Sequence, residues 1–255
     1  MGRKEKPEKS TVMQVDAEET DDITPPVVVV LPGEAVQLPS NVSTVVRLGP
    51  GLRQDADGVA VTKAGVLRQT AQGDKVWVEG NQRRYVPQLN ESVLGVVTAK
   101  LGENYRVDIG GPHPASLGVL AFEGATKRNR PNLEIGSLVF ARVSLANKDM
   151  EPELDCINPT NGKADGFGEV KGGFMFKCSL GLSRSLLDPS NPFLQHLGNI
   201  CPFETAVGMN GRVWLRSDKA KQTILIMQAL LESETIPYNK ARAHIKKFKT
   251  ELGEK

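Results

Sequence analysis

Short apolar runs separated by glycine and proline turns dominate the first 145 residues of this sequence. The longest uninterrupted apolar run, Val27–Leu31, has only five residues, whereas a membrane-spanning helix needs about 20. β-Branched runs of this length, bounded by turn residues, are typical of strands in small all-β units. The sequence therefore predicts a mostly β protein without a membrane-spanning segment.

Two β units are predicted in this part of the chain. The first, residues 27–87, alternates short β-branched runs with turns such as Pro32-Gly33 and Asp57-Gly58, and its last strand is expected at 75–79. The second covers residues 88–150. Its strands are expected at 93–100, 105–109, 115–122 and 137–145. About five strands in a segment of this length is the proportion of an OB-fold barrel.

A third unit, residues 151–236, mixes strand and helix periodicities. Its elements are expected as strand 172–178, helices 180–187 and 192–199, strands 204–207 and 212–216, and helix 217–234. This β-α-α-β-β-α order is that of a KH domain, so the fold ends in an α+β domain. Ser217 is expected to cap the last helix, with Asp218 in its first turn.

The two ends of the chain differ from the body in charge. Residues 1–24 hold four basic and seven acidic side chains, and residues 1–26 are expected to form a disordered acidic tail. Since the whole chain has a net charge of +2 and the tail of −3, the rest carries +5. This excess suits a polyanionic partner without requiring one. Residues 237–255 are expected to form a basic helix with a solvated face, and its apolar residues recur at helical spacing, so one side should pack on another surface.

Signatures of metal binding, catalysis and secretion are missing from the sequence. The cysteines and histidines are widely scattered, with no pair at metal-ligand spacing: Cys156, Cys178, Cys201, His113, His196 and His244. Nucleophile-elbow, zincin, P-loop and dinucleotide motifs do not occur. The charged N-terminus has no apolar segment behind it for secretion. We expect an intracellular protein with no catalytic residues, no cofactor, no metal and no membrane partner.

Several longer stretches of the sequence resemble a known family. They are Val29–Glu34, Gly49–Leu52, Arg84–Pro87, Gly95–Lys100, Phe122–Asn132, Ala146–Glu153 and Gly208–Trp214. With the order of an N-terminal β unit, an S1-type OB-fold barrel and a KH domain, they resemble the S1/KH-type cap subunits of the RNA exosome. The resemblance runs from about residue 27 to about residue 232.

This resemblance implies a non-catalytic subunit that sits, with the other S1/KH cap subunits, on a ring of RNase PH-like subunits. It would stabilise the ring and guide single-stranded RNA into it for ribosomal RNA processing, RNA degradation and mRNA decay. It would be found in the nucleus, nucleolus and cytoplasm. Two alternatives remain: a free-standing S1/KH RNA-binding protein, and an exonuclease that uses the carboxylates Asp149, Glu151, Glu153 and Asp155, which are more typical of a solvated interdomain loop.

Candidate RNA contacts lie in the barrel. They are Lys100, Tyr105, Arg106, Lys127, Arg128, Asn129 and Arg130. The hairpin 127–130 offers three cations and an amide to phosphates, but a contact with a neighbouring subunit and plain solvation remain open. Tyr105 lies where S1 domains usually carry an aromatic residue, so it is either a platform for base stacking or a core residue. Lys100 and Arg106 are expected to make weak backbone contacts.

The motif Gly208-Met209-Asn210-Gly211 is similar to the G-x-x-G clamp with which KH domains hold a nucleic-acid backbone. It lies between two predicted strands, however, and Asn-Gly is a strong signal for a hairpin turn. The place of the clamp, between the two short helices, is taken by residues 188–192, which include an acid. The sequence therefore favours a structural motif. The resemblance implies that it packs the KH domain on the barrel, with Trp214 as a buried anchor.

Overall fold

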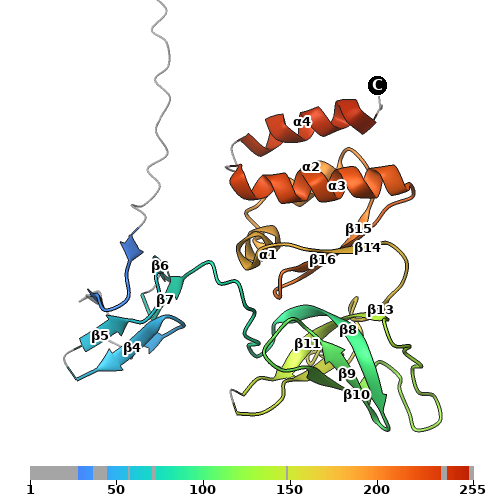
Figure 1. The fold of residues 1–255 in the computed structure, drawn as a ribbon, viewed down its shortest axis with the longest axis horizontal. Coiled ribbons are helices and arrows are strands. Elements are labelled where there is room, and N and C mark those ends of the chain that lie inside the picture. Colours follow the sequence, from blue (N-terminus) through green and yellow to red (C-terminus); the bar gives the residue numbers. More distant parts are fainter. Residues whose placement is uncertain are drawn as a thin grey trace, which may run out of the picture. The chain divides into compact units, whose positions relative to one another are not determined.

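The structure is a computed structural model that describes residues 28–36, 45–56, 58–70, 73–147, 149–236 and 240–252. In the last helix, it describes the side chains of residues 243–248. The predicted acidic tail, residues 1–26, lies outside the described residues. The chain divides into two units, residues 1–79 and 80–255, which are described separately (Figure 1).

The first unit consists of two small sheets with strand orders β1-β6-β7-β3 and β2-β5-β4. The strands are β1 Val29–Val30, β2 Ala35–Val36, β3 Arg47–Leu48, β4 Leu52–Asp55, β5 Gly58–Val61, β6 Gly65–Gln69 and β7 Lys75–Glu79. Its small core contains Val30, Val61 and Val78. The strand predicted at 75–79 is found with the same ends. Strand β4, Leu-Arg-Gln-Asp, was missed because three of its four side chains are polar and exposed.

The second unit begins with a closed barrel of antiparallel and parallel strands. They are β8 Ser92–Leu101, β9 Asn104–Asp108, β10 Ala115–Phe122, β11 Leu138–Leu145, β12 Glu153–Cys156 and β13 Gly168–Val170. The sheet order is β12-β10-β9-β8-β11-β13, and β12 also pairs with β11, which closes the barrel. Alternate residues of each strand fill its interior, including Val107, Leu117 and Val139.

Strands β12 and β13 lie beyond residue 150, the predicted end of the barrel. β12 pairs with both β10 and β11, and β13 pairs with β11, so the sheet extends to Val170. The acidic residues of β12 obscured it, because Glu153 and Asp155 occupy the outer face while Leu154 and Cys156 are buried. The boundary between barrel and KH domain therefore lies near residue 171.

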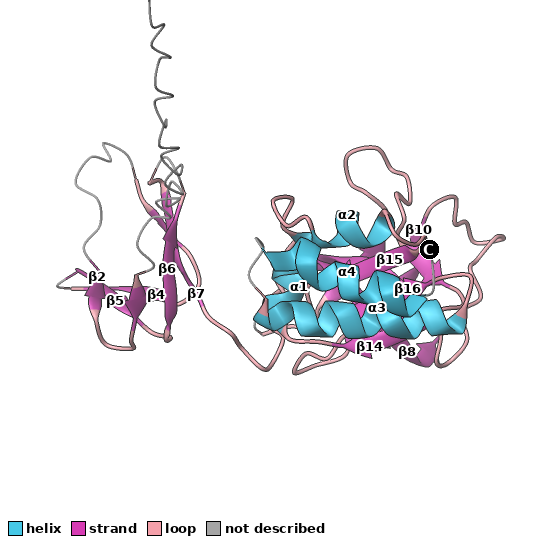
Figure 2. Ribbon diagram, turned by 90° about the horizontal axis from the view of Figure 1, so that it is seen from above, coloured by secondary structure: helices cyan, strands magenta, loops and turns pink. Residues whose placement is uncertain are grey.

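The KH domain follows in the predicted order. Its elements are β14 Phe174–Lys177, α1 Leu180–Leu187, α2 Phe193–Gly198, β15 Glu204–Gly208, β16 Arg212–Arg216, α3 Ala220–Glu232, a short 3-10 turn at Ser233–Thr235 and α4 Ala241–Leu252. The strands form a sheet of order β14-β16-β15. The helices cover one face of this sheet, and the barrel lies beyond its other face (Figures 1 and 2).

The predicted cap of the long helix is wrong. Helix α3 begins at Ala220, its N-cap residue is Lys219 without a side-chain cap, and its first turn contains no acid. Ser217 lies before this start, and its hydroxyl donates to the Gln222 side-chain oxygen at 3.0 Å. Because Ser217 lies two positions before the N-cap residue, it does not occupy the position from which a side chain accepts from the first helix amides.

Helix α4 packs on the KH domain through Ile245 and Phe248, which are buried in its core. The predicted apolar side of the basic helix is thus the side that contacts the KH domain. Its Lys246 and Lys247 are exposed. Among the described helices, none combines the length and the apolar character that a membrane span requires.

Candidate nucleic-acid interface

The basic hairpin lies in the loop that joins β10 to β11, at one end of the barrel. The Thr126 amide donates to the Asn129 carbonyl at 3.0 Å, and the Asn129 amide donates to the Thr126 hydroxyl at 3.0 Å, which closes a tight turn. Arg130 is held by the Lys127 carbonyl at 3.1 Å and faces Glu103 at 3.5 Å. The side chains of Lys127 and Arg128 are exposed, and neither forms an ion pair within the described part of the chain. They are therefore the cations of this loop that are open to phosphates.

Lys100 lies at the same end of the barrel, where β8 ends. Its ammonium group donates to the side-chain oxygen of Asn132 at 2.7 Å and lies 5.5 Å from the centre of the Tyr105 ring. The structure thus brings Lys100 toward the base of the basic loop, because only Pro131 separates Asn132 from the hairpin 127–130.

Tyr105 belongs to the core and not to the surface. It is 1% exposed, and its hydroxyl donates to the Pro131 carbonyl. The same oxygen accepts from the Leu133 amide at 3.4 Å. A ring so enclosed presents no face to a base, so its prediction as a stacking platform is corrected to the alternative of a core residue.

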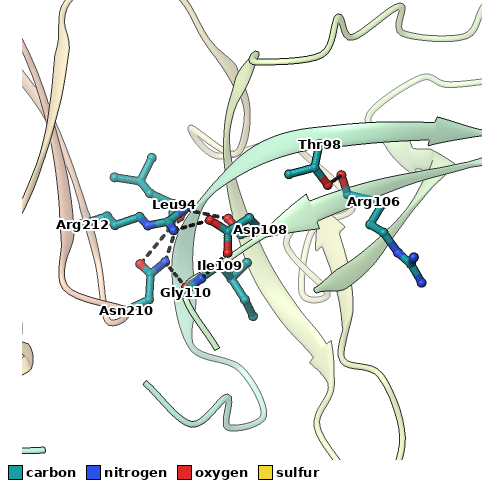
Figure 3. A network of polar contacts seen from close by, with 8 residues as sticks. All are labelled: Leu94, Thr98, Arg106, Asp108, Ile109, Gly110, Asn210 and Arg212. Carbon is teal, nitrogen blue, oxygen red and sulfur yellow. Dashed lines mark hydrogen bonds and ion pairs between the residues drawn. The ribbon is translucent and has the colours of Figure 1, made fainter. Parts of the chain in front are cut away.

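Arg106 is exposed on β9, on the face opposite to that of the buried Tyr105 and Val107. Its guanidinium pairs with Glu151 at 3.0 Å, and it points away from the residues that join the barrel to the KH domain (Figure 3). A second carboxylate of the acidic segment, Asp155, pairs with Arg142 at 3.3 Å. Within the described residues, no group of three or more histidine, cysteine or acidic side chains forms a possible metal site.

The motif 208–211 forms the junction between KH domain and barrel (Figure 3). The Asn210 side-chain amide donates to the carbonyls of Leu94 and Ile109 at 2.8 Å each, and its oxygen accepts from the Leu94 amide at 3.2 Å. The Met209 amide donates to the Ser92 carbonyl at 2.8 Å. The three bonds of Asn210 are buried, so they join the two domains through backbone groups that water does not reach.

Glycines permit this close approach. A Cβ on Gly208 would come within 2.3 Å of the Asn210 side-chain oxygen and 2.7 Å of the Leu94 nitrogen. Gly211 has a φ of +72° and would place a Cβ 2.7 Å from the Cys178 carbonyl. Trp214, on the following strand, is buried and donates from its ring nitrogen to the Gly172 carbonyl at 2.7 Å. The contacts of all five predicted motif residues are therefore internal ones.

Arg212 completes the junction and was not predicted. It is buried, donates to the Asp108 carbonyl at 2.6 Å and pairs with the Asp108 carboxylate at 2.7 Å. Burial alone would raise the pKa of Asp108, but the hydrogen bonds from Arg212 and the Gly110 amide, with the Arg212 charge, lower it below its ordinary value. The pair therefore stays ionised near neutral pH.

The loop between α1 and α2, where a KH clamp would lie, is built around an acid. Asp188 accepts from the Ser190 amide at 2.9 Å and from the Ser190 hydroxyl at 2.7 Å. These hydrogen bonds lower the pKa of Asp188, so its carboxylate is charged. A fixed negative charge at this position repels a phosphate backbone.

Comparisons with known proteins agree on one family. Residues 85–168 match the model of the S1 domain of exosome complex component RRP40, residues 46–84 match the Rrp40 N-terminal domain, and residues 173–221 match a KH domain. The exosome complex component rrp40 of Schizosaccharomyces pombe is 48% identical over 194 residues, which are 74% of this chain and 80% of that protein. The human exosome complex component RRP40 is 44% identical over 211 residues, 78% of this chain and 76% of that protein. The chain belongs to the RRP40 family of exosome complex components.

A solved structure described as an exosome complex RNA-binding protein matches this RRP40-family chain with a TM-score of 0.56 and 22% identity. It covers 68% of this chain and all of its own length, and at this identity it supports the fold alone. The RRP40 S1 domain model ends at residue 168, which agrees with a barrel that continues through β12 and β13.

Sequence reasoning missed a further contact in this RRP40-family chain. Arg184 of α1 donates to the Gly80 carbonyl at 2.8 Å, and its charge acts on the part-buried pair in which Tyr85 donates to Glu91 at 2.6 Å. Burial raises the pKa of Glu91, although the hydrogen bond from Tyr85 and the Arg184 charge oppose the rise. The only signal in the sequence was an arginine among the leucine, glycine and serine residues of α1. Such a residue does not reveal a partner 104 positions away.

Proposed function

We propose that this RRP40-family chain is a non-catalytic cap subunit of the RNA exosome, a 3'-5' exoribonuclease complex. It stabilises the RNase PH-like ring together with the other S1/KH cap subunits, and it guides single-stranded RNA into the ring. The observation that carries the proposal is the exposed cationic loop on a barrel that buried hydrogen bonds join to the KH domain. The proposal includes ribosomal RNA processing and RNA degradation in the nucleus, nucleolus and cytoplasm.

The RNA contact is assigned to phosphates and not to bases. Lys127 and Arg128 supply exposed charge without a neighbouring exposed aromatic in their loop, and Tyr105 is enclosed. Charge without stacking or base-edge contacts gives weak, sequence-independent binding. This suits a chain that must let RNA slide past it.

The absence of catalysis is supported by the pairing of the acidic segment. A two-metal nuclease site needs carboxylates that are free to coordinate cations. Here Glu151 and Asp155 face Arg106 and Arg142, whose charges oppose metal binding. We expect the purified chain not to degrade RNA in the presence of magnesium. Degradation that Asp149→Asn abolishes would establish the exonuclease alternative instead.

The assembly is tested by isolating the native complex from cell extract with a tagged chain and identifying its components by mass spectrometry. We expect RNase PH-like ring subunits and other S1/KH subunits to be recovered in one particle. Recovery of the chain with RNA alone would overturn the proposal in favour of a free-standing RNA-binding protein.

The RNA contact is tested by reversing two charges in the full chain, Lys127→Glu with Arg128→Glu. Binding of a single-stranded oligouridine should weaken, and the slope of log affinity against log salt should decrease in magnitude by about 1.4, since each of the two lost contacts removes about 0.7. The matched control is Lys63→Glu with Lys75→Glu, two exposed lysines of the N-terminal unit. Equal weakening in both double variants would refute a contact specific to the loop.

A further inference from the structure

An apolar groove lies between the first strand and the long helix of the KH domain. Its volume is 560 Å³, and its lining residues are Gly173, Phe174, Ser217, Ala220, Thr223, Ile224 and Met227. The four residues from α3 have the spacing of one helix face. Phe174 is 53% exposed and Ile224 is 52% exposed. The groove therefore presents two large apolar side chains to solvent at one place.

The strand that borders this groove is at the edge of its sheet. In the order β14-β16-β15, β14 pairs with β16 alone among the described strands. The Cys178 amide donates to the Gly211 carbonyl at 2.8 Å, on the side of β16. Because amides alternate in direction along an antiparallel strand, those of Met175 and Lys177 point to the open edge. Backbone donors and acceptors thus lie beside an apolar groove, which is the arrangement for adding a peptide strand.

The charge at this edge is positive. Lys177 is exposed and lies directly opposite Arg212 in the strand register, and the nearby carboxylate, Asp108, is bound to Arg212. Two cations therefore face one anion. Among the cations of neighbouring segments, Lys171 pairs with Glu169 at 3.1 Å, and Arg216 pairs with Glu204 at 3.7 Å. An acidic side chain opposite Lys177 on an added strand would offset the remaining charge.

We propose that an extended segment of a partner protein adds to β14 as a further strand. Its alternate apolar side chains enter the groove against Phe174 and Ile224, and acidic side chains between them lie beside Lys177. The backbone hydrogen bonds would supply affinity, and the groove would supply specificity. This inference goes beyond the proposed function, because it holds whether or not the basic loop at the end of the barrel contacts RNA.

The test is a titration of the ¹⁵N-labelled full chain with a peptide of about six residues that alternates valine and glutamate. We expect shifts of the Met175 and Lys177 amide signals and slower hydrogen exchange at both, because a new strand would bond them. A peptide that alternates valine and lysine should bind more weakly. Unchanged β14 amides at saturating peptide would overturn the proposal.

Two substitutions on α3 distinguish peptide binding in the groove from binding elsewhere on the helix surface. Ile224→Lys should weaken binding of the valine-glutamate peptide by about tenfold or more, whereas Leu231→Lys should change it by less than about twofold. Leu231 is 38% exposed on the same helix, so it is the matched control, and circular dichroism checks that both variants fold. Equal effects of the two substitutions would contradict a site in this groove. If oligouridine bound at the same amides more strongly than the peptide, the ligand of this edge would be a nucleic acid and the proposal of a peptide strand would be overturned.

Discussion

At the scale of single residues, the barrel and the KH domain depend on side chains that combine burial with a specific hydrogen bond. Tyr105 and Trp214 are the aromatic examples, and each ends in a polar group that reaches a backbone carbonyl. A buried aromatic residue of this kind contributes both apolar area and orientation. Its replacement therefore affects stability, and it affects ligand binding only if the ring is accessible.

Trp214→Ala should destabilise the KH domain by about 3 to 5 kcal/mol, because it leaves a cavity and removes the bond to the Gly172 carbonyl. Trp214→Phe keeps most of the apolar volume and should cost less, about 1 to 3 kcal/mol. Urea unfolding measures both. A near-neutral Trp214→Ala would show that the indole is not an anchor.

Tyr105→Leu should lower stability without weakening RNA binding, since the ring is enclosed by the loop that contains Pro131 and Leu133. Fluorescence anisotropy with a single-stranded oligouridine measures the affinity, and thermal unfolding measures the stability. A stacking platform would instead lose about 1 to 3 kcal/mol of binding free energy. The two roles are distinguished by which measurement changes.

At the scale of elements, the β9 and β16 strands are joined by an ion pair that depends on pH. The lowered pKa of Asp108 means that its carboxylate stabilises the fold when ionised. That contribution is fully present above the unfolded pKa of aspartate, about 3.9, and is lost as the pH falls through the lower folded pKa. The strand junction is therefore weaker in acid.

Asp108→Asn tests this dependence. The variant should be less stable than the parent at pH 7, and the difference should shrink below about pH 4, where the parent carboxylate also becomes neutral. Chemical unfolding at several pH values measures the difference. Glu151→Gln, which breaks an exposed pair with Arg106, is the control and should have little effect. A difference that stays constant with pH would contradict the assignment.

At the scale of the whole molecule, barrel and KH domain form one of the two units of the chain. Asn210 and Arg212 donate to backbone carbonyls of the barrel from a hairpin of the KH sheet. Separation of the two domains would leave these buried groups without partners, which is costly. The unit is therefore expected to behave as one cooperative structure.

Calorimetry of residues 80–255 should show a single unfolding transition for this unit. Asn210→Ala should lower its midpoint and broaden or split it, because the Leu94 and Ile109 groups lose their partners. Asn132→Ala, at an exposed position, is the control. Two well-separated transitions in the parent protein would show that the domains unfold independently.

Much of the architecture followed from local patterns. Alternating apolar residues and turn signals predicted β10, α1 and β16 with their observed ends, and the dipeptide Asn210-Gly211 marked its hairpin. The patterns failed where polar side chains occupied a strand, as in β4 and β12. In β4, three polar residues leave no apolar alternation, whereas in β12 the alternation is present but short, and its acids beside Pro152 are more typical of a solvated loop.

The sequence alone determined the element types, the domain order and the place of the basic hairpin, because these depend on residues that are neighbours in the chain. Only the tertiary structure decided that Tyr105 is enclosed, that Arg212 meets Asp108 and that β12 closes the barrel. Strand periodicity assigns residues to the two faces of a strand, but it does not determine which face another segment covers. Contacts between residues far apart in sequence depend on how the sheets close and pack, which no local pattern contains.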